Sequence, residues 1–195
     1  MIPLWVKIPY ILFVSVLVPV YWIEYGPANF LWFSDIALLA ILVALWLENR
    51  LLASMMAVAV LFLELVWNVE FFMRVITGAN LMGLADYMFD PKIPVFVRAL
   101  SLFHVVLPVI LFWMIYRLGY DKRALVLQTL LAWIVLPTSY LVSNPSDNVN
   151  WVFGLGNEPQ NWMPGPLYVM VLMVLLPLLV YLPTHFALKK AFASS

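Results

Sequence analysis

Apolar residues run along this chain in long stretches, separated by short clusters of charged residues, proline and glycine. A helix crosses about 30 Å of hydrocarbon with about 20 such residues, at a rise of about 1.5 Å per residue. Stretches of this kind cover Ile8–Glu24, Phe30–Leu47, Leu51–Val75, Val95–Tyr116, Ala124–Val142 and Leu167–Leu188. The pattern predicts an all-α fold, a polytopic membrane bundle of about six transmembrane helices, with residues 1–195 forming a single integral membrane domain.

The connections between these stretches differ in length and polarity. Glu48–Arg50 and Gly119–Arg123 predict tight turns. In the longer connection 78–94, Leu81–Phe89 mixes apolar and polar residues and is compatible with an interfacial helix. The connection Ser143–Pro166 is dense in Asn, Gly and Pro, and predicts either an ordered, lid-like loop or a merely solvated one.

Composition supports the membrane class and excludes several functions. Hydrophobic residues make up 66% of the chain and charged residues 10%, against about 45–50% and about 25% in soluble domains. The ten basic and ten acidic residues balance, so no basic field favours nucleic acid, and the expected partners are membrane lipids. The absence of cysteine excludes disulfides, thiolate nucleophiles and Cys-ligated metals. We therefore expect no cofactor.

The basic residues predict an orientation. The side of the N-terminus holds seven of the ten, namely Lys7, Arg50, Arg117, Lys122, Arg123, Lys189 and Lys190. Only Arg74, Lys92 and Arg98 fall on the opposite side. Because Lys and Arg in short loops are enriched on the cytoplasmic face, we expect both termini to be cytoplasmic.

Polar residues of the spans share one depth, in the half away from the termini. They are Ser34 and Asp35 in the second span, Glu64 and Asn68 in the third, and Ser101 and His104 in the fourth. The loop Asp147–Trp151 is expected directly above them. A carboxylate inside hydrocarbon costs at least ~2.5–3.5 kcal/mol, so Asp35 needs a partner, a proton or a function. One buried polar site in the outer leaflet accounts for all of these positions.

The cluster has two interpretations. An imidazole, a hydroxyl and two carboxylates are the ingredients of nucleophilic or acid–base chemistry. Each member also has a structural alternative: Ser34 as a helix-packing hydroxyl, Asp35 paired with Arg98 or Asn68, Glu64 with Asn68 as an interhelical clamp, and His104 as a satisfied core donor. A zinc site from His104, Asp35 and Glu64 is disfavoured, because only one histidine is near and cysteine is absent. We expect no metal.

Three segments carry a resemblance to a known family. Phe30–Ala37 resembles the Leu-Pro-Leu-His-Leu-Cys-Asp-Ile-Ala segment of the YwaF-like bacterial membrane proteins and their transmembrane acyltransferase relatives, with Ser34 at the cysteine position. His104–Leu111 and Asp147–Phe153 are similar to their His-containing span and to the loop before their last helix. More distantly, the chain resembles the androgen-induced protein family of lipid hydrolases. Trp32 and Leu31 replace the His and Pro that precede the family cysteine.

The resemblance implies an intramembrane hydrolase or acyltransferase of acyl lipids, in a bacterial inner membrane, with Ser34 as nucleophile and His104 as general base. Asp35 or Glu64 would orient the imidazole, and Asn68 or Asn150 would donate to the oxyanion. Ser101 and Trp151 complete the predicted substrate-binding set. Asp35 points about 100° away from Ser34 on a helix, which favours Glu64 as the orienting group. The competing hypothesis is a non-enzymatic protein that binds a lipid, an ion or a proton.

Overall fold

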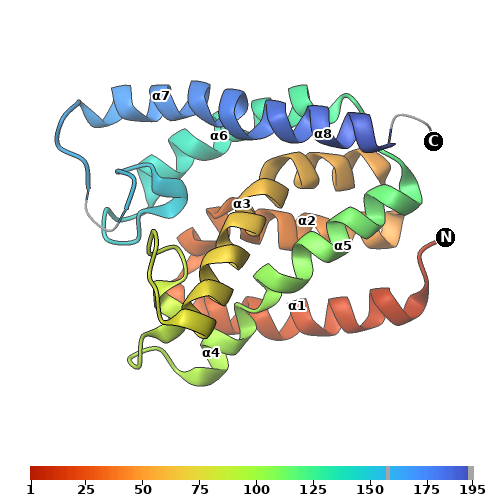
Figure 1. Cartoon of the computed structure of the whole chain (residues 1–195), viewed down its shortest axis with the longest axis horizontal. Helices are drawn as coiled ribbons and strands as arrows, with labels where there is room; N and C mark the ends of the chain where they lie inside the picture. Colours follow the sequence, from red (N-terminus) through yellow and green to blue (C-terminus); the bar gives the residue numbers. More distant parts are fainter. Residues whose placement is uncertain (157–158, 193–195) are drawn as a thin grey trace.

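The computed structural model describes residues 1–156 and 159–192 and shows an all-α bundle of membrane-spanning type, as the apolar pattern predicts (Figure 1). The elements follow the predicted spans closely. They are α1 (Leu4–Tyr25), α2 (Phe33–Leu47), α3 (Arg50–Thr77), α4 (Val95–Leu100) with α5 (Phe103–Leu118), α6 (Ala124–Val142), and α7 (Gly165–Leu176) with α8 (Leu182–Phe192). Five of these stretches are long and apolar enough to cross a membrane, and α2 is a shorter apolar helix.

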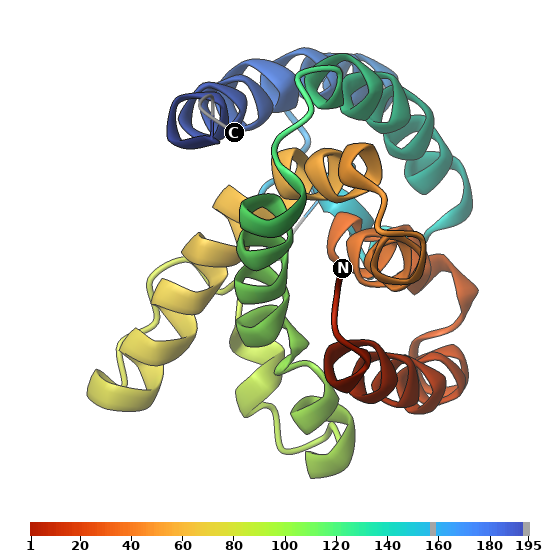
Figure 2. The same cartoon turned by 90° about the vertical axis from the view of Figure 1, so that its right-hand side faces the viewer.

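Helix α3 is the centre of the bundle and contacts α2, α5, α6 and α8. Its half near the termini buries small side chains such as Ala53, Ser54, Ala57 and Ala59, which let neighbouring helices approach closely. The helix pair α7–α8 and helix α1 lie on opposite sides of this centre, and both termini lie at the same end (Figures 1 and 2). The two long connections meet at the other end, which we call the loop end.

The second span begins later than predicted. Pro27–Leu31 forms a 3-10 turn, Trp32 is extended at ψ 134°, and α2 starts at Phe33. Proline is favoured at the start of such a turn because it lacks an N–H that would otherwise be unpaired. Ser34 and Asp35 therefore lie in the first turn of α2, and their expected position deeper inside a longer helix is wrong.

The connection after α3 is also different from the expectation. Residues 81–89 form turns and a short 3-10 helix, η2 (Asp86–Phe89), and no interfacial α-helix. Gly78, at φ 75°, ends α3 in the left-handed conformation that glycine tolerates. Arg74 then pairs with Asp86, and Ala85 is fully buried. These contacts fold the connection back onto α3: Ala85 is buried and Leu84, Met88 and Phe89 are half-buried, while Leu81 and Met82 stay exposed.

The connection between α6 and α7 is an ordered loop over its described residues 143–156 and 159–164. Asn148 organises it, because its side chain accepts from the Phe153 N–H at 3.0 Å and donates to the Gly154 carbonyl at 2.9 Å. Asn148, Asn150 and Trp151 have φ values of 41°, 55° and 56°. Left-handed conformations of this kind are tolerated best by asparagine among non-glycine residues. Of the two predicted alternatives, the ordered loop is correct.

Candidate functional site

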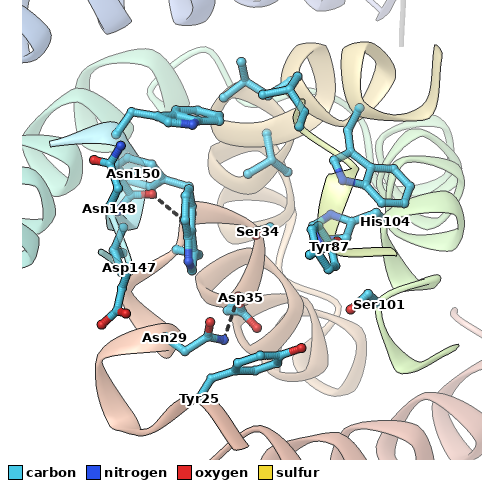
Figure 3. A pocket seen from close by; sticks show the side chains of 18 of the residues that line it. Tyr25, Asn29, Ser34, Asp35, Tyr87, Ser101, His104, Asp147, Asn148 and Asn150 are labelled. Atoms are coloured by element: carbon cyan, nitrogen blue, oxygen red, sulfur yellow. Dashed lines mark hydrogen bonds between the residues drawn. The ribbon is translucent and has the colours of Figure 1, made fainter. Parts of the chain in front are cut away.

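A cavity of about 780 Å³ opens at the loop end. Its volume lies within the range of small-molecule sites, about 300–1,000 Å³. Helices α1, α2, α3 and α5 and both long connections supply its walls (Figure 3). The polar side chains that line it are Tyr21, Glu24, Tyr25, Asn29, Ser34, Asp35, Glu64, Tyr87, Ser101, His104, Ser146, Asp147, Asn148 and Asn150. The predicted convergence of polar residues from separate spans is thus present in the fold.

Glu64 and His104 form the best-defined contact in the cavity wall. The Glu64 carboxylate is 3% exposed, and its Oε2 lies 2.8 Å from His104 Nδ1. Trp67 and Phe103 stack on the imidazole, with ring centroids 4.7 Å and 4.1 Å away. The ring is therefore held by a hydrogen bond at one edge and by aromatic faces on its flat sides. Of the two carboxylates predicted to orient His104, Glu64 is the one hydrogen-bonded to it.

This contact determines the chemistry of the other imidazole nitrogen. A carboxylate can only accept, so Nδ1 carries the proton and the neutral ring keeps its lone pair on Nε2. Among the described residues, His104 Nε2 has no hydrogen-bond partner. The side chain is thus arranged to take a proton from a group in the cavity, with Glu64 stabilising the imidazolium that results.

Ser34 and Asp35 stand on the same cavity wall, at the start of α2 (Figure 3). The Ser34 hydroxyl has no hydrogen-bond partner among the described residues, and so none with His104. Asp35 is 4% exposed; its Oδ2 accepts only a long bond of 3.5 Å from Asn29, and its Oδ1 is buried without a partner. The alternative pairing with Arg98 is wrong, because that guanidinium donates to the Met88 carbonyl at 3.0 Å.

The first turn of α2 also offers backbone donors. The first N–H groups of a helix have no intrahelical acceptor. The Phe33 N–H donates to Asn150 Oδ1 at 3.0 Å, while no described residue accepts from the N–H of Ser34 or Asp35. A serine in this position has donors for an oxyanion in its own helix turn.

The predicted amide donors have other partners. Asn68 donates to the backbone carbonyls of Glu64 and His104, both at 2.7 Å, so it clamps α3 to α5 and does not line the cavity. Asn150 donates to the Leu31 carbonyl at 2.7 Å and to Ser139 Oγ at 3.1 Å. Because these contacts occupy their N–H groups, the expectation that either amide donates to an oxyanion is wrong. Both amides instead hold the cavity walls in place.

The remaining predicted residues lie in the wall. Ser101 Oγ is 2.5 Å from the Tyr21 hydroxyl, which joins α1 to the start of the α5 segment. Trp151 packs edge-on against Trp32, with ring centroids 5.5 Å apart. Both tryptophans line the cavity, so Trp151 is part of a site wall as well as of the aromatic belt that its position suggests.

Sequence reasoning missed the tyrosines. Tyr21, Tyr25 and Tyr87 line the cavity, and the Tyr25 hydroxyl is buried without a partner. Burial holds the pKa of Tyr87, in the connection outside the spans, well above its usual value, so it stays a neutral donor. The one available signal was the four-residue spacing of Tyr21 and Tyr25, which places both on one helix face at the C-terminal end of the first span.

The described residues contain no group of three or more His, Asp or Glu side chains arranged to hold a metal ion. The polar side chains that line the cavity carry an imidazole, hydroxyls, carboxylates and amides. Comparison of the chain with models of known protein families, with curated proteins and with solved structures gives no match. Function must be inferred from the geometry alone.

Proposed function

We propose that the protein is a membrane hydrolase or acyltransferase of acyl lipids, with Ser34 as nucleophile and His104 as general base. One observation carries the proposal: the Glu64–His104 hydrogen bond of 2.8 Å, on the wall of a cavity that Ser34 also lines. A nucleophile, a base and a group that orients the base are the three parts needed for acyl transfer by a hydroxyl.

The reaction follows from these roles. His104 Nε2 takes the Ser34 proton as Oγ attacks the acyl carbonyl carbon, and Glu64 stabilises the imidazolium. The N–H groups of Ser34 and Asp35 donate to the oxyanion. The imidazolium then protonates the leaving alcohol oxygen as its bond to the acyl carbon breaks. Water releases the acyl group from Ser34 in a hydrolase, and a second alcohol accepts it in a transferase.

In this mechanism the hydrogen bond between Ser34 and His104 forms when the substrate is bound. Catalytic hydrogen bonds are often long or absent in unliganded proteins and tighten in the substrate complex. Ser34 stands in the first turn of α2, where its side chain meets the cavity and needs no helix movement to change rotamer. Rotation about its Cα–Cβ bond is the smallest motion that redirects Oγ.

The orientation in the membrane is part of the proposal. The end that holds the termini carries seven of the ten basic residues, so we place it in the cytoplasm of a bacterial inner membrane and the cavity in the outer leaflet. Reporter fusions at positions 80 and 155 should read as external. An internal signal from either fusion contradicts this orientation.

A second candidate, a lipid-binding protein without catalysis, is favoured by one feature. The Ser34 hydroxyl has no hydrogen bond to His104, whereas the buried Asp35 Oδ1 lacks any partner, as expected of a group that waits for a ligand. In this case Asp35, Glu64 and His104 form a binding site and Ser34 is only a wall residue.

Turnover of acyl lipids distinguishes the two candidates. Purified protein is incubated with a mixture of diacyl phospholipids, and released fatty acid and transferred acyl chains are measured by mass spectrometry. Ser34→Ala and His104→Ala should each lower turnover at least 1,000-fold, and the double variant should be no worse, because residues acting as one unit are not additive. Thr138→Ala, at a half-buried hydroxyl of α6 outside the cavity, is the matched hydroxyl control and should keep full turnover. Unchanged turnover in Ser34→Ala contradicts the enzyme proposal.

A further inference from the structure

We infer that the cavity selects ligands that carry a positively charged organic ammonium group. The titratable side chains that line it include the acids Glu24, Asp35, Glu64 and Asp147, and His104 is the single basic one among the described lining residues. No lysine or arginine is among those lining residues. A low-dielectric pocket lined by one sign of charge raises the local concentration of the opposite sign.

Asp35 gives this charge a defined point of contact. Its side chain is 4% exposed and lines the cavity, and its Oδ1 has no hydrogen bond. It stands in the first turn of α2, where the helix dipole favours a negative charge. A buried carboxylate without a counter-ion is costly, and a cation in the cavity would remove that cost.

Glu64 cannot serve the same purpose, because its Oε2 is engaged with His104. Arg98, the counter-ion considered from the sequence, donates elsewhere, to the Met88 carbonyl. The charge of Asp35 is therefore not neutralised by the described residues of the protein itself. A proton or a cation in the cavity can remove this charge, and a cationic ligand would replace the proton.

The walls fit an organic cation better than a metal ion. Among the described residues no His, Asp and Glu group is arranged as a metal site, and a cavity of about 780 Å³ is far larger than one ion needs. Trp32, Trp151, Trp67 and Tyr25 present aromatic rings to the same space. Aromatic faces attract ammonium groups, and quaternary ammonium ligands are bound in aromatic cages on this principle.

The inference names the substrate class of the proposed enzyme and in that sense rests on the proposed function, but binding does not require catalysis. The ammonium group has two possible sources, a lipid headgroup or a free amine. Phosphatidylethanolamine and phosphatidylcholine carry it, while phosphatidylglycerol has the same phosphate and no cation, which makes it the matched control.

The test uses the full-length Ser34→Ala protein in detergent, so that no lipid is consumed. Native mass spectrometry measures binding of the three phospholipids with identical acyl chains, and free ethanolamine is added as a competitor. We expect both ammonium lipids to bind at least 10-fold more tightly than phosphatidylglycerol. If free ethanolamine displaces the lipids, the ammonium group alone is sufficient for binding. If it does not, the protein recognises the whole lipid. Equal binding of phosphatidylglycerol overturns the inference.

Two variants locate the preference. Asp35→Asn should reduce the preference for ammonium lipids at least 10-fold. Asp90→Asn makes the same change in the connection between α3 and α4, outside the cavity, and should leave the preference intact. A preference that survives Asp35→Asn overturns the assignment. The inferred ligand class and the proposed enzyme can fail separately. If the protein binds ammonium lipids but its turnover does not depend on Ser34, the proposed enzyme is wrong and the ligand class stands.

Discussion

The two ends of the bundle treat their polar residues in opposite ways. At the end that holds the termini, polar groups pair with one another: His185 Nδ1 is 2.6 Å from the Tyr120 hydroxyl, and Lys7 donates to Glu48 at 3.1 Å. Arg50 donates to the Tyr120 carbonyl at 2.5 Å. At the loop end, the cavity leaves Asp35 Oδ1 and the Tyr25 hydroxyl without partners.

The difference separates a closed polar cluster from one that is open to a cavity. Both ends contain a histidine bonded through Nδ1, but His185 meets a tyrosine in a closed network, whereas His104 meets a carboxylate beside an open cavity. Buried polar groups in proteins are nearly always paired, so unpaired ones that share a cavity call for a ligand. Gln128 Oε1, near the end that holds the termini, is also unpaired, but Gln128 is not among the described residues that line the cavity.

The largest effect on turnover among these tests is expected at Glu64. Glu64→Gln keeps the size of the side chain but removes the charge that stabilises the imidazolium, so we expect turnover to fall about 100-fold or more. Melting should change little, since the amide can still accept from His104. Glu70→Gln, a buried carboxylate of α3 outside the cavity, is the matched control. Full turnover in Glu64→Gln would remove the orienting role.

Asn150 tests whether the loop holds the cavity in shape. Asn150→Ala removes hydrogen bonds to Phe33 N, the Leu31 carbonyl and Ser139 Oγ. At about 1 kcal/mol for each bond, the free energy of unfolding should fall by about 2–3 kcal/mol. Asn144→Ala, an exposed amide of the same loop, should change it by less than about 0.5 kcal/mol. Equal effects in denaturant titrations would show that Asn150 is no more than a surface residue.

Substitutions at the end that holds the termini should change the stability of the protein and not its turnover. Tyr120→Phe removes the hydroxyl bonded to His185 and should cost about 1 kcal/mol of unfolding free energy while acyl-lipid turnover stays unchanged. Tyr116→Phe, an exposed tyrosine on α5, should change neither quantity. A loss of turnover in Tyr120→Phe would mean that the two ends are coupled.

The smallest expected effect is a pH dependence at the turn between α2 and α3. The N–H of Ile2 and the Lys7 ammonium hold the pKa of Glu48 below its usual value of 4.5. A lowered folded-state pKa stabilises the protein above pH 4.5, and the contribution is lost as pH falls through the folded pKa. The melting temperature of the wild type should therefore be higher than that of Glu48→Gln at pH 7, and the difference should shrink below pH 4.5. A difference that is constant across this range would contradict the ionic contribution.

The sequence predicted the spans because membrane helices have a strong one-dimensional signal. Every predicted span has its helix, since a stretch of about 20 apolar residues has no other stable structure in hydrocarbon. The convergence of Ser34, Asp35, Glu64 and His104 on one cavity was also predictable, because orientation turns sequence position into depth.

Local geometry was less accessible. The start of α2 depends on a 3-10 turn at Pro27–Leu31, which the apolar pattern does not distinguish from helix. The amides of Asn68 and Asn150 were predicted as oxyanion donors, but backbone carbonyls and Ser139 occupy them. Which acceptor an amide finds depends on helix packing, and composition and spacing do not determine packing.

Labelling with an alkyl fluorophosphonate tests the central claim, that His104 activates Ser34 in the cavity at the loop end. The probe phosphonylates a serine whose proton is removed by a base, with loss of fluoride. We predict a single labelled serine, Ser34, identified by peptide mass spectrometry, and at least a 100-fold slower reaction in His104→Ala. Ser15→Ala, at an exposed hydroxyl of α1 outside the cavity, should be labelled as fast as the wild type. Absence of label on Ser34 in the wild type, or an equal rate in His104→Ala, would contradict the claim.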